Sequence, residues 1–240
     1  MERRGTVPYR FIILTNKIES REVYSSSIDN SGGSGIIESR GYYAGLGEKL
    51  EALKAKITNS LAIDDYKEVS EEYLNSLPRY TEPLSIKESL MLTNPTNDEY
   101  NCQRCVPAYE MLRRGYKVHA TLAPKNWLDD NIGFGDFKKI FIGSEWHQTN
   151  GSGIEDIEKF LTNAGNNARV EISFMTTDGS HLIVAENDNG LIKFVDPQKN
   201  RIDVRWYFDD ETIILGKTEF ARIDNLNVSN LIKQCLEVEV

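Results

Sequence analysis

The tripeptide Asp188-Asn189-Gly190 most constrains the fold, because it lies between two apolar runs of strand length. Asn and Gly tolerate positive φ, so the segment predicts the tight turn of a β-hairpin. With the turn centred between 189 and 190, paired residues have numbers that sum to about 379. His181 and Asp196 then lie diagonally opposite at the open end of the hairpin, within reach of each other.

The elements expected around this hairpin place helices before strands. A helix from about residue 105 to 114 ends at Gly115, and a second helix over 154–164 ends at Gly165. Strands are expected at 116–122, 168–176, 181–186, 191–195, 202–208, 212–215 and 219–223, and a short helix at 229–236 closes the chain. Helices followed by antiparallel strands indicate an α+β fold.

The first part of the chain has weaker signals, and we divide the chain into an N-terminal extension, 1–90, and a second domain, 91–240, that contains the helices and strands listed above. The role of the extension does not follow from its sequence. Its expected elements are a strand at 10–14, a loop at 25–35, helices at 48–61 and 69–77, and an extended stretch punctuated by Pro78, Pro83 and Pro95.

Composition excludes several classes of partner. The net charge is −9 and the pI is near 5.0, so the chain has no general attraction for nucleic acid or anionic lipid. The longest apolar runs are far too short to span a bilayer, and no secretory signal is visible at the N-terminus. We therefore expect neither a nucleic-acid partner nor membrane insertion.

Three cysteines do not form a disulfide framework, since the count is odd and two of them are three residues apart. A structural zinc site needs four ligands close together. One CxxC and three histidines scattered along the chain, His119, His147 and His181, do not indicate such a site. A thioredoxin-type CxxC normally follows a strand, whereas polar residues 96–100 precede this one. No metal and no cofactor are expected.

The CxxC lies instead at the N-terminus of the expected helix, where amide groups and the helix dipole favour a thiolate. Cys102 lies at the mouth of the helix, and Cys105 fits the apolar face with Val106 and Tyr109. Pro107 prefers the first turn and moves the expected helix start to 104–106, which keeps Cys105 a candidate nucleophile beside the favoured Cys102.

A thiol at this place has a candidate base and a candidate carboxylate in the hairpin. An aspartate against an imidazole fixes its tautomer and stabilises the imidazolium. Spacing alone leaves a second interpretation open, in which His181 follows a turn and Asp196 begins an Asp-Pro turn. Gln198, two residues after Asp196, is a further candidate hydrogen-bond donor in the site.

Three sequence blocks resemble a known family. They are Asn-Cys-x-x-Cys-Val-x-Ala-Tyr-Glu-x-x-Arg-Arg-Gly-Tyr-x-Val-x-Ala at 101–120, Gly-Ser-His-Leu-Ile-Val-Ala-Glu at 179–186, and Phe-Val-Asp-Pro-Gln at 194–198. Together they are similar to the papain-fold toxin domains of the glutamine deamidase type, the Tox-PL family. The resemblance covers about residues 94–236 and none of 1–90.

The resemblance implies a papain-like cysteine hydrolase fold and a triad of Cys102, His181 and Asp196. It implies a bacterial or phage-encoded effector that deamidates a protein glutamine through a thioester and is delivered into a target cell. It also implies an immunity protein as a second partner. A cysteine protease or acyltransferase with the same triad, and a non-catalytic phage or secretion-associated structural module, stay open as alternatives.

Overall fold

The structure is a computed structural model that describes residues 63–124, 132 and 135–238. These residues belong to one compact unit, Leu61–Val240. The strand expected at 10–14, the loop at 25–35 and the helix at 48–61 lie outside the described residues. No helix among the described residues is long and apolar enough to cross a membrane.

Among the described residues, four helical segments precede the first strand. They are the 3-10 helix η1 (Ile63–Tyr66) and the α-helices α2 (Glu71–Ser76), α3 (Ile86–Thr93) and α4 (Cys102–Arg113). Helix α3 corrects the expectation of an extended stretch between the prolines. Its signal is a capping box, in which Ser85 and Glu88 each bind the other's backbone amide.

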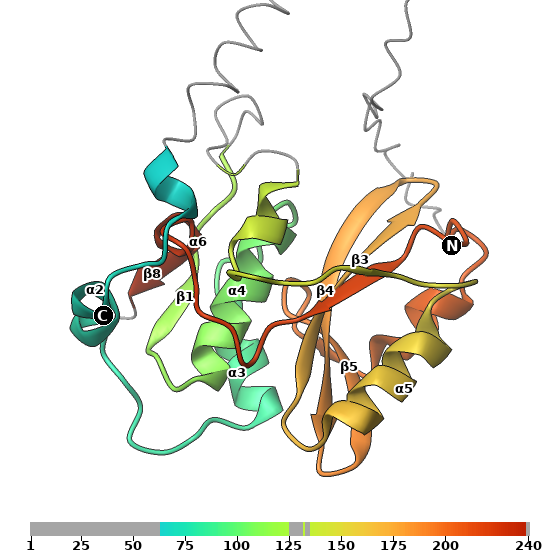
Figure 1. Ribbon diagram of the computed structural model, residues 1–240, viewed down its shortest axis with the longest axis horizontal. Coiled ribbons are helices and arrows are strands. Elements are labelled where there is room, and N and C mark those ends of the chain that lie inside the picture. The colour runs from blue at the N-terminus through green and yellow to red at the C-terminus, as the bar shows by residue number, and fades with distance from the viewer. Residues whose placement is uncertain (1–62, 125–131, 133–134, 239–240) are drawn as a thin grey trace, which may run out of the picture. The chain divides into compact units, whose positions relative to one another are not determined.

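Within the described residues, eight strands form two antiparallel sheets, and the larger sheet lies beside α4 (Figure 1). Strands β1 (Val118–Ala120) and β8 (Leu236–Val238) make a two-stranded sheet beside α4. The larger sheet has the order β2-β7-β3-β4-β5-β6. Its strands are β2 (His147–Gln148), β3 (Arg169–Thr176), β4 (Gly179–Asp188), β5 (Leu191–Asp196), β6 (Arg201–Ile202) and β7 (Glu219–Arg222).

The β4–β5 hairpin has the expected register. Asp188 pairs with Leu191 and Val184 pairs with Val195, so paired numbers sum to 379. Asn189 and Gly190 both have positive φ, 53° and 91°, as the turn requires. The hairpin therefore brings the start of β4 beside the end of β5.

The larger sheet is buried on both faces. Alternate residues of β4 point to opposite faces, and both sets belong to hydrophobic clusters. Leu182 and Val184 belong to a core cluster shared with α4, whereas Ile183 and Ala185 belong to a second cluster shared with α5 (Ile154–Ala164). The bounds of α5 agree with those expected from sequence. Helices α4 and α5 thus hold the sheet between them (Figure 1).

Two other expectations are wrong, and a third has the right type of element but the wrong length. The segment 202–208 is not a strand, since β6 ends at Ile202, Asp203 adopts a left-handed φ of 60°, and the 3-10 helix η4 (Val204–Asp209) follows. Residues 212–215 contribute only the bridge between Ile213 and Thr176. The closing helix is a single turn, α6 (Ile232–Cys235), after which the chain becomes β8.

The segment before residue 91 contributes to the same core as α4. Val69, Leu77 and Leu90 are buried in the cluster that contains Val106 and Leu112. Two backbone hydrogen bonds, from the Tyr80 amide to the Gly115 carbonyl and from Lys117 to Pro78, join this segment to the end of α4. The division of the chain at residues 90 and 91 stays a prediction.

Candidate active site

Helix α4 begins at Cys102, earlier than the start at 104–106 that Pro107 favoured; Pro107 lies inside the helix. The N-cap residue Asn101 makes no side-chain hydrogen bond to the helix amides. Its backbone carbonyl accepts the amides of Arg104 and Cys105 instead. Within the described part of the chain, no acceptor binds the amides of Cys102 and Gln103, so two N–H groups stay available at this helix end.

The two cysteines of α4 have different surroundings. Cys105 is fully buried, and its thiol donates a hydrogen bond to Oδ1 of Asn101 over 3.1 Å. Burial and then the negative charge of Cys102 raise the pKa of Cys105 well above its usual value, which disfavours a thiolate there. Cys102 is partly exposed and forms a hydrogen bond with His181.

His181 and Asp196 are in direct contact at the open end of the hairpin. Nε2 of His181 lies 2.9 Å from Oδ2 of Asp196, so the ring nitrogen left for Cys102 is Nδ1. Burial alone would lower the pKa of His181. The hydrogen bonds with Asp196 and Cys102, and the negative charges of both, raise that pKa to about 10. The imidazolium of His181 is therefore its favoured form at neutral pH.

Asp196 is fully buried, and all of its hydrogen-bonding capacity is used. Oδ1 accepts the backbone amides of Gln198 and Lys199, both over 3.0 Å. Oδ2 accepts His181 and the hydroxyl of Tyr207, both over 2.9 Å. Burial raises the pKa of Asp196, but these donors and the charge of His181 outweigh it, so the net shift is downward and the carboxylate stays ionised.

Tyr207 was not identified from the sequence, because it lies in the segment expected as a strand. The signal that could have found it is the spacing of Val204 and Phe208, which are four residues apart, as on one face of a helical turn. Both are buried, and the turn they anchor presents Tyr207 toward Asp196.

A buried polar chain joins the start of α4 to the loop after β5. Nδ2 of Asn101 donates to Oδ1 of Asn94 over 3.3 Å, and Nδ2 of Asn94 donates to the carbonyl of Gln198 over 2.8 Å. Gln198, singled out from the sequence, thus holds Asp196 through its backbone. Its side-chain Nε2 is buried and has no hydrogen-bond partner among the described residues.

Glu171, on β3, is a second buried acid near the thiol and was not identified from the sequence. It is 2% exposed and pairs with Val184 on β4 and Ala221 on β7. Burial, followed by the negative charge of Cys102, raises its pKa well above the usual value, while Lys138 opposes the shift. The carboxyl of Glu171 therefore keeps its proton to a higher pH than an exposed glutamate does.

The remaining histidines lie in other contacts. Nε2 of His119 on β1 is 3.3 Å from Oε2 of Glu237, and the ring of His147 on β2 packs with those of Phe160 and Phe220 in one aromatic cluster. The described residues contain no group of three or more His, Cys, Asp or Glu side chains that could hold a metal ion.

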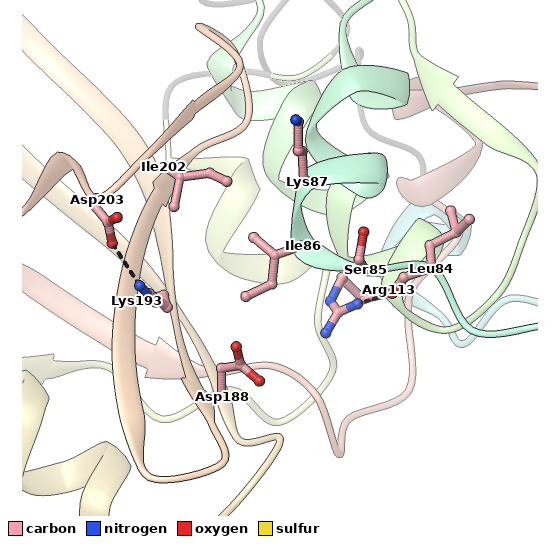
Figure 2. Close-up of a pocket in the computed structure, with 9 residues that line it drawn as sticks. All are labelled: Leu84, Ser85, Ile86, Lys87, Arg113, Asp188, Lys193, Ile202 and Asp203. Carbon is pink, nitrogen blue, oxygen red and sulfur yellow. Dashed lines mark hydrogen bonds and ion pairs between the residues drawn. The ribbon is translucent and has the colours of Figure 1, made fainter.

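A cavity of about 460 Å³ lies between the start of α3 and the end of the β4–β5 hairpin (Figure 2). It is lined by Leu84, Ser85, Ile86, Lys87, Arg113, Asp188, Lys193, Ile202 and Asp203. Arg113 is the last residue of α4 and Cys102 the first, so the cavity and the cysteine are at opposite ends of this helix. None of Cys102, His181 and Asp196 lines the cavity.

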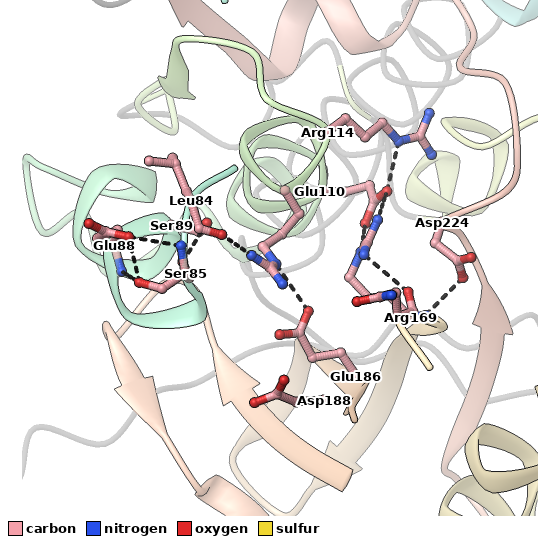
Figure 3. Close-up of polar contacts among 12 residues, drawn as sticks. Leu84, Ser85, Glu88, Ser89, Glu110, Arg114, Arg169, Glu186, Asp188 and Asp224 are labelled. Carbon is pink, nitrogen blue, oxygen red and sulfur yellow. Dashed lines mark hydrogen bonds and ion pairs between the residues drawn. The ribbon is translucent and has the colours of Figure 1, made fainter. Parts of the chain in front are cut away.

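An ion network fixes α4 to the sheet at this same end (Figure 3). The guanidinium of Arg169 donates to both oxygens of the fully buried Glu110, over 2.6 and 3.0 Å, and Arg114 donates to Glu110 over 2.7 Å. Arg113 donates to Glu186 on β4 over 3.2 Å. These bonds hold the helix against β3 and β4 and thereby set where its N-terminus lies.

A helix that begins with a cysteine and packs on an antiparallel sheet carrying a histidine and an aspartate defines the papain-like fold. The fold is α+β, as the sequence predicted. More particularly, residues 100–201 match the family described as papain fold toxin 1, glutamine deamidase. The family resemblance drawn from sequence is confirmed over these residues, which contain Cys102, His181 and Asp196. No curated protein matches the chain.

Proposed function

We propose that this protein is a thiol-dependent hydrolase that deamidates a glutamine side chain of a protein. Its nucleophile is Cys102, its base is His181, and Asp196 orients the base. The observation that carries the proposal is the His181–Asp196 contact of 2.9 Å, partly buried, beside a partly exposed Cys102 at a helix N-terminus. The family match adds the chemistry, since the family is one of papain-fold toxin deamidases.

The first half of the reaction forms a thioester. The Cys102 thiolate attacks the carboxamide carbon, and the electron pair of the carbonyl moves to oxygen. The free amides of Cys102 and Gln103 lie at the same helix end as the thiol and are available to stabilise this oxyanion. The imidazolium of His181 gives its proton to the amine, the carbon–nitrogen bond breaks, and ammonia leaves.

The second half releases glutamate. His181, now neutral, takes a proton from a water molecule, which attacks the thioester carbon. The carbon–sulfur bond breaks, and the thiolate and the imidazolium are restored. Asp196 keeps its charge throughout, as its lowered pKa requires, and holds the Nε2 proton of His181.

The biological setting is part of the same proposal. The family is one of toxins, which supports a protein substrate and delivery into a target cell. A bacterial or phage origin and an immunity protein that binds this chain complete the proposal. The match spans 100–201, so the family supports no role for residues 1–90.

The decisive experiment compares two cysteine variants of the full chain. Candidate target proteins are incubated with each variant, and mass spectrometry of their peptides detects conversion of glutamine to glutamate. Cys102→Ala is expected to abolish conversion, whereas Cys105→Ala keeps it, because Cys105 is buried and protonated. Full activity of Cys102→Ala together with an inactive Cys105→Ala would refute the assignment.

The same assay separates the alternative chemistries. A protease shortens the target chain, and an acyltransferase joins the glutamine to an added amine, such as fluorescent cadaverine. A non-catalytic module gives none of these products and leaves Cys102 unlabelled by iodoacetamide at neutral pH.

A further inference from the structure

The contact between Tyr207 and Asp196 extends the site beyond the matched residues 100–201. We propose that Tyr207 is a positioning residue for the reaction, which acts on His181 through the carboxylate of Asp196. The inference rests on the proposed function, since it assumes that His181 is the base. It assigns a part of the reaction to η4, an element outside the family match.

Tyr207 binds the oxygen that matters for the base. Oδ1 of Asp196 accepts two backbone amides, whose direction is fixed by the path of the main chain. Oδ2 has two side-chain donors, His181 and Tyr207, each at 2.9 Å. The Tyr207 hydroxyl therefore fixes the direction of the lone pairs that His181 meets, and it draws part of the negative charge of Asp196 away from the imidazole.

The hydroxyl stays a donor over the working pH range. Burial, followed by the charge of Asp196 and the hydrogen bond to it, raises the pKa of Tyr207, against an opposing contribution from Arg201. The other titratable groups that act on this pair from the packed elements are Cys102 and Cys105 on α4 and His181 on β4. A neutral tyrosine adds a dipole to the site without adding a charge.

The ring of Tyr207 is held separately from its hydroxyl. Its ring centroid lies 6.3 Å from the ring centroids of both His181 and Phe174. The ring centroid of Trp206 lies 4.6 Å away in an edge-type contact. A phenylalanine keeps these ring contacts and loses only the hydrogen bond. Tyr207→Phe thus isolates the effect of one hydroxyl on the base.

The test measures the titration of His181 and the reactivity of Cys102 in the full chain. NMR of the histidine rings follows the pKa of His181, assigned by loss of its signal in His181→Gln. The pH profile of alkylation of Cys102 by iodoacetamide is read by peptide mass spectrometry. Neither readout needs a protein substrate, so both remain valid if no glutamine target is converted.

Tyr207→Phe is expected to raise the pKa of His181, because Asp196 then directs more charge to the imidazole. On a glutamine substrate kcat falls about tenfold at unchanged KM, as expected for loss of one hydrogen bond to a charged group. The matched control is Tyr66→Phe, which deletes a hydroxyl bound to Oδ1 of Asp136 over 3.2 Å in η3 (Asp136–Lys139), outside the site. It is expected to leave both readouts unchanged.

A His181 titration in Tyr207→Phe that superimposes on the wild type would overturn the proposal. If Tyr207→Phe melts early, 3-fluorotyrosine placed at 207 keeps the ring and makes a stronger donor. The pKa of His181 is then expected to fall, opposite to the phenylalanine variant, and an unchanged value would again refute the role of Tyr207.

Discussion

Replacing Glu110 by glutamine tests whether the ion network of Figure 3 holds helix α4 on the sheet. Glu110 has no exposed surface, and the side chain of Arg169 is 9% exposed, so water cannot solvate either charge in the folded protein. The glutamine keeps the shape of Glu110 but removes the negative charge that three guanidinium hydrogen bonds share.

The expected loss of stability follows from the buried partner that is left. Removing one member of a buried ion pair costs about 3–5 kcal/mol, since the other charge stays desolvated and uncompensated. The carboxamide introduced by Glu110→Gln would still offer one carbonyl oxygen to Arg169, which places the expected loss near the lower bound, about 3 kcal/mol. In a unit of this size, each kcal/mol lowers Tm by about 2–4 °C, so the expected shift is about 6–12 °C.

Urea unfolding followed by circular dichroism measures the free energy of unfolding, and a thermal melt gives the shift in Tm. The matched control is Glu158→Gln, which breaks an ion pair with Arg205 of 2.8 Å whose side chains are 35% and 50% exposed. An exposed pair contributes less than about 1 kcal/mol. If Glu110→Gln loses no more than Glu158→Gln, the network does not stabilise the fold and our reasoning about α4 is wrong.

Two further perturbations test the site and the start of α5. The raised pKa of Glu171 means that the folded state keeps its proton above pH 4.5, so wild-type stability falls as pH rises from 4.5 toward the folded pKa. Glu171→Gln is expected to remove this fall and to gain about 1 kcal/mol or more over wild type at pH 8 in urea unfolding, with no gain at pH 4; parallel pH curves would contradict the burial of an uncharged acid. Gly153 and Gly165 have left-handed φ values of 93° and 89°, which alanine adopts only with strain. Gly153→Ala and Gly165→Ala are therefore each expected to lower the free energy of unfolding by about 1–2 kcal/mol. Only at Gly153 does the new Cβ meet atoms within 3 Å, Oγ1 of Thr149 and Cγ2 of Thr218, so a further loss of about 1–3 kcal/mol is expected there; equal melts for the two variants would refute the clash.

The hairpin and α5 could be predicted from sequence because their signals are local. The Asn189-Gly190 turn sets the register of every pair in β4 and β5, and one apolar stripe with Gly165 at its end sets α5. The contact of His181 with Asp196 follows directly from that register.

Two of the wrong expectations concern short helices, whose apolar residues resemble a strand or lie between prolines. At α3, the flanking prolines predict an extended segment, but a capping box starts a helix there. At η4, a run of bulky residues after β6 has strand composition, and only the left-handed Asp203 breaks it. Tyr207 was missed for this reason. Glu171 was missed because its burial depends on packing between strands distant in sequence.

The partition of the site between a hairpin and a distant helix has a consequence for folding kinetics. His181 and Asp196 are 15 residues apart, so the chain closes this contact at a small entropic cost as soon as the hairpin forms. Cys102 meets them only when α4 has packed on the sheet, a contact of far greater sequence separation. The rate at which iodoacetamide labels Cys102 during refolding is therefore expected to report helix docking, and to change later than the signal from sheet formation.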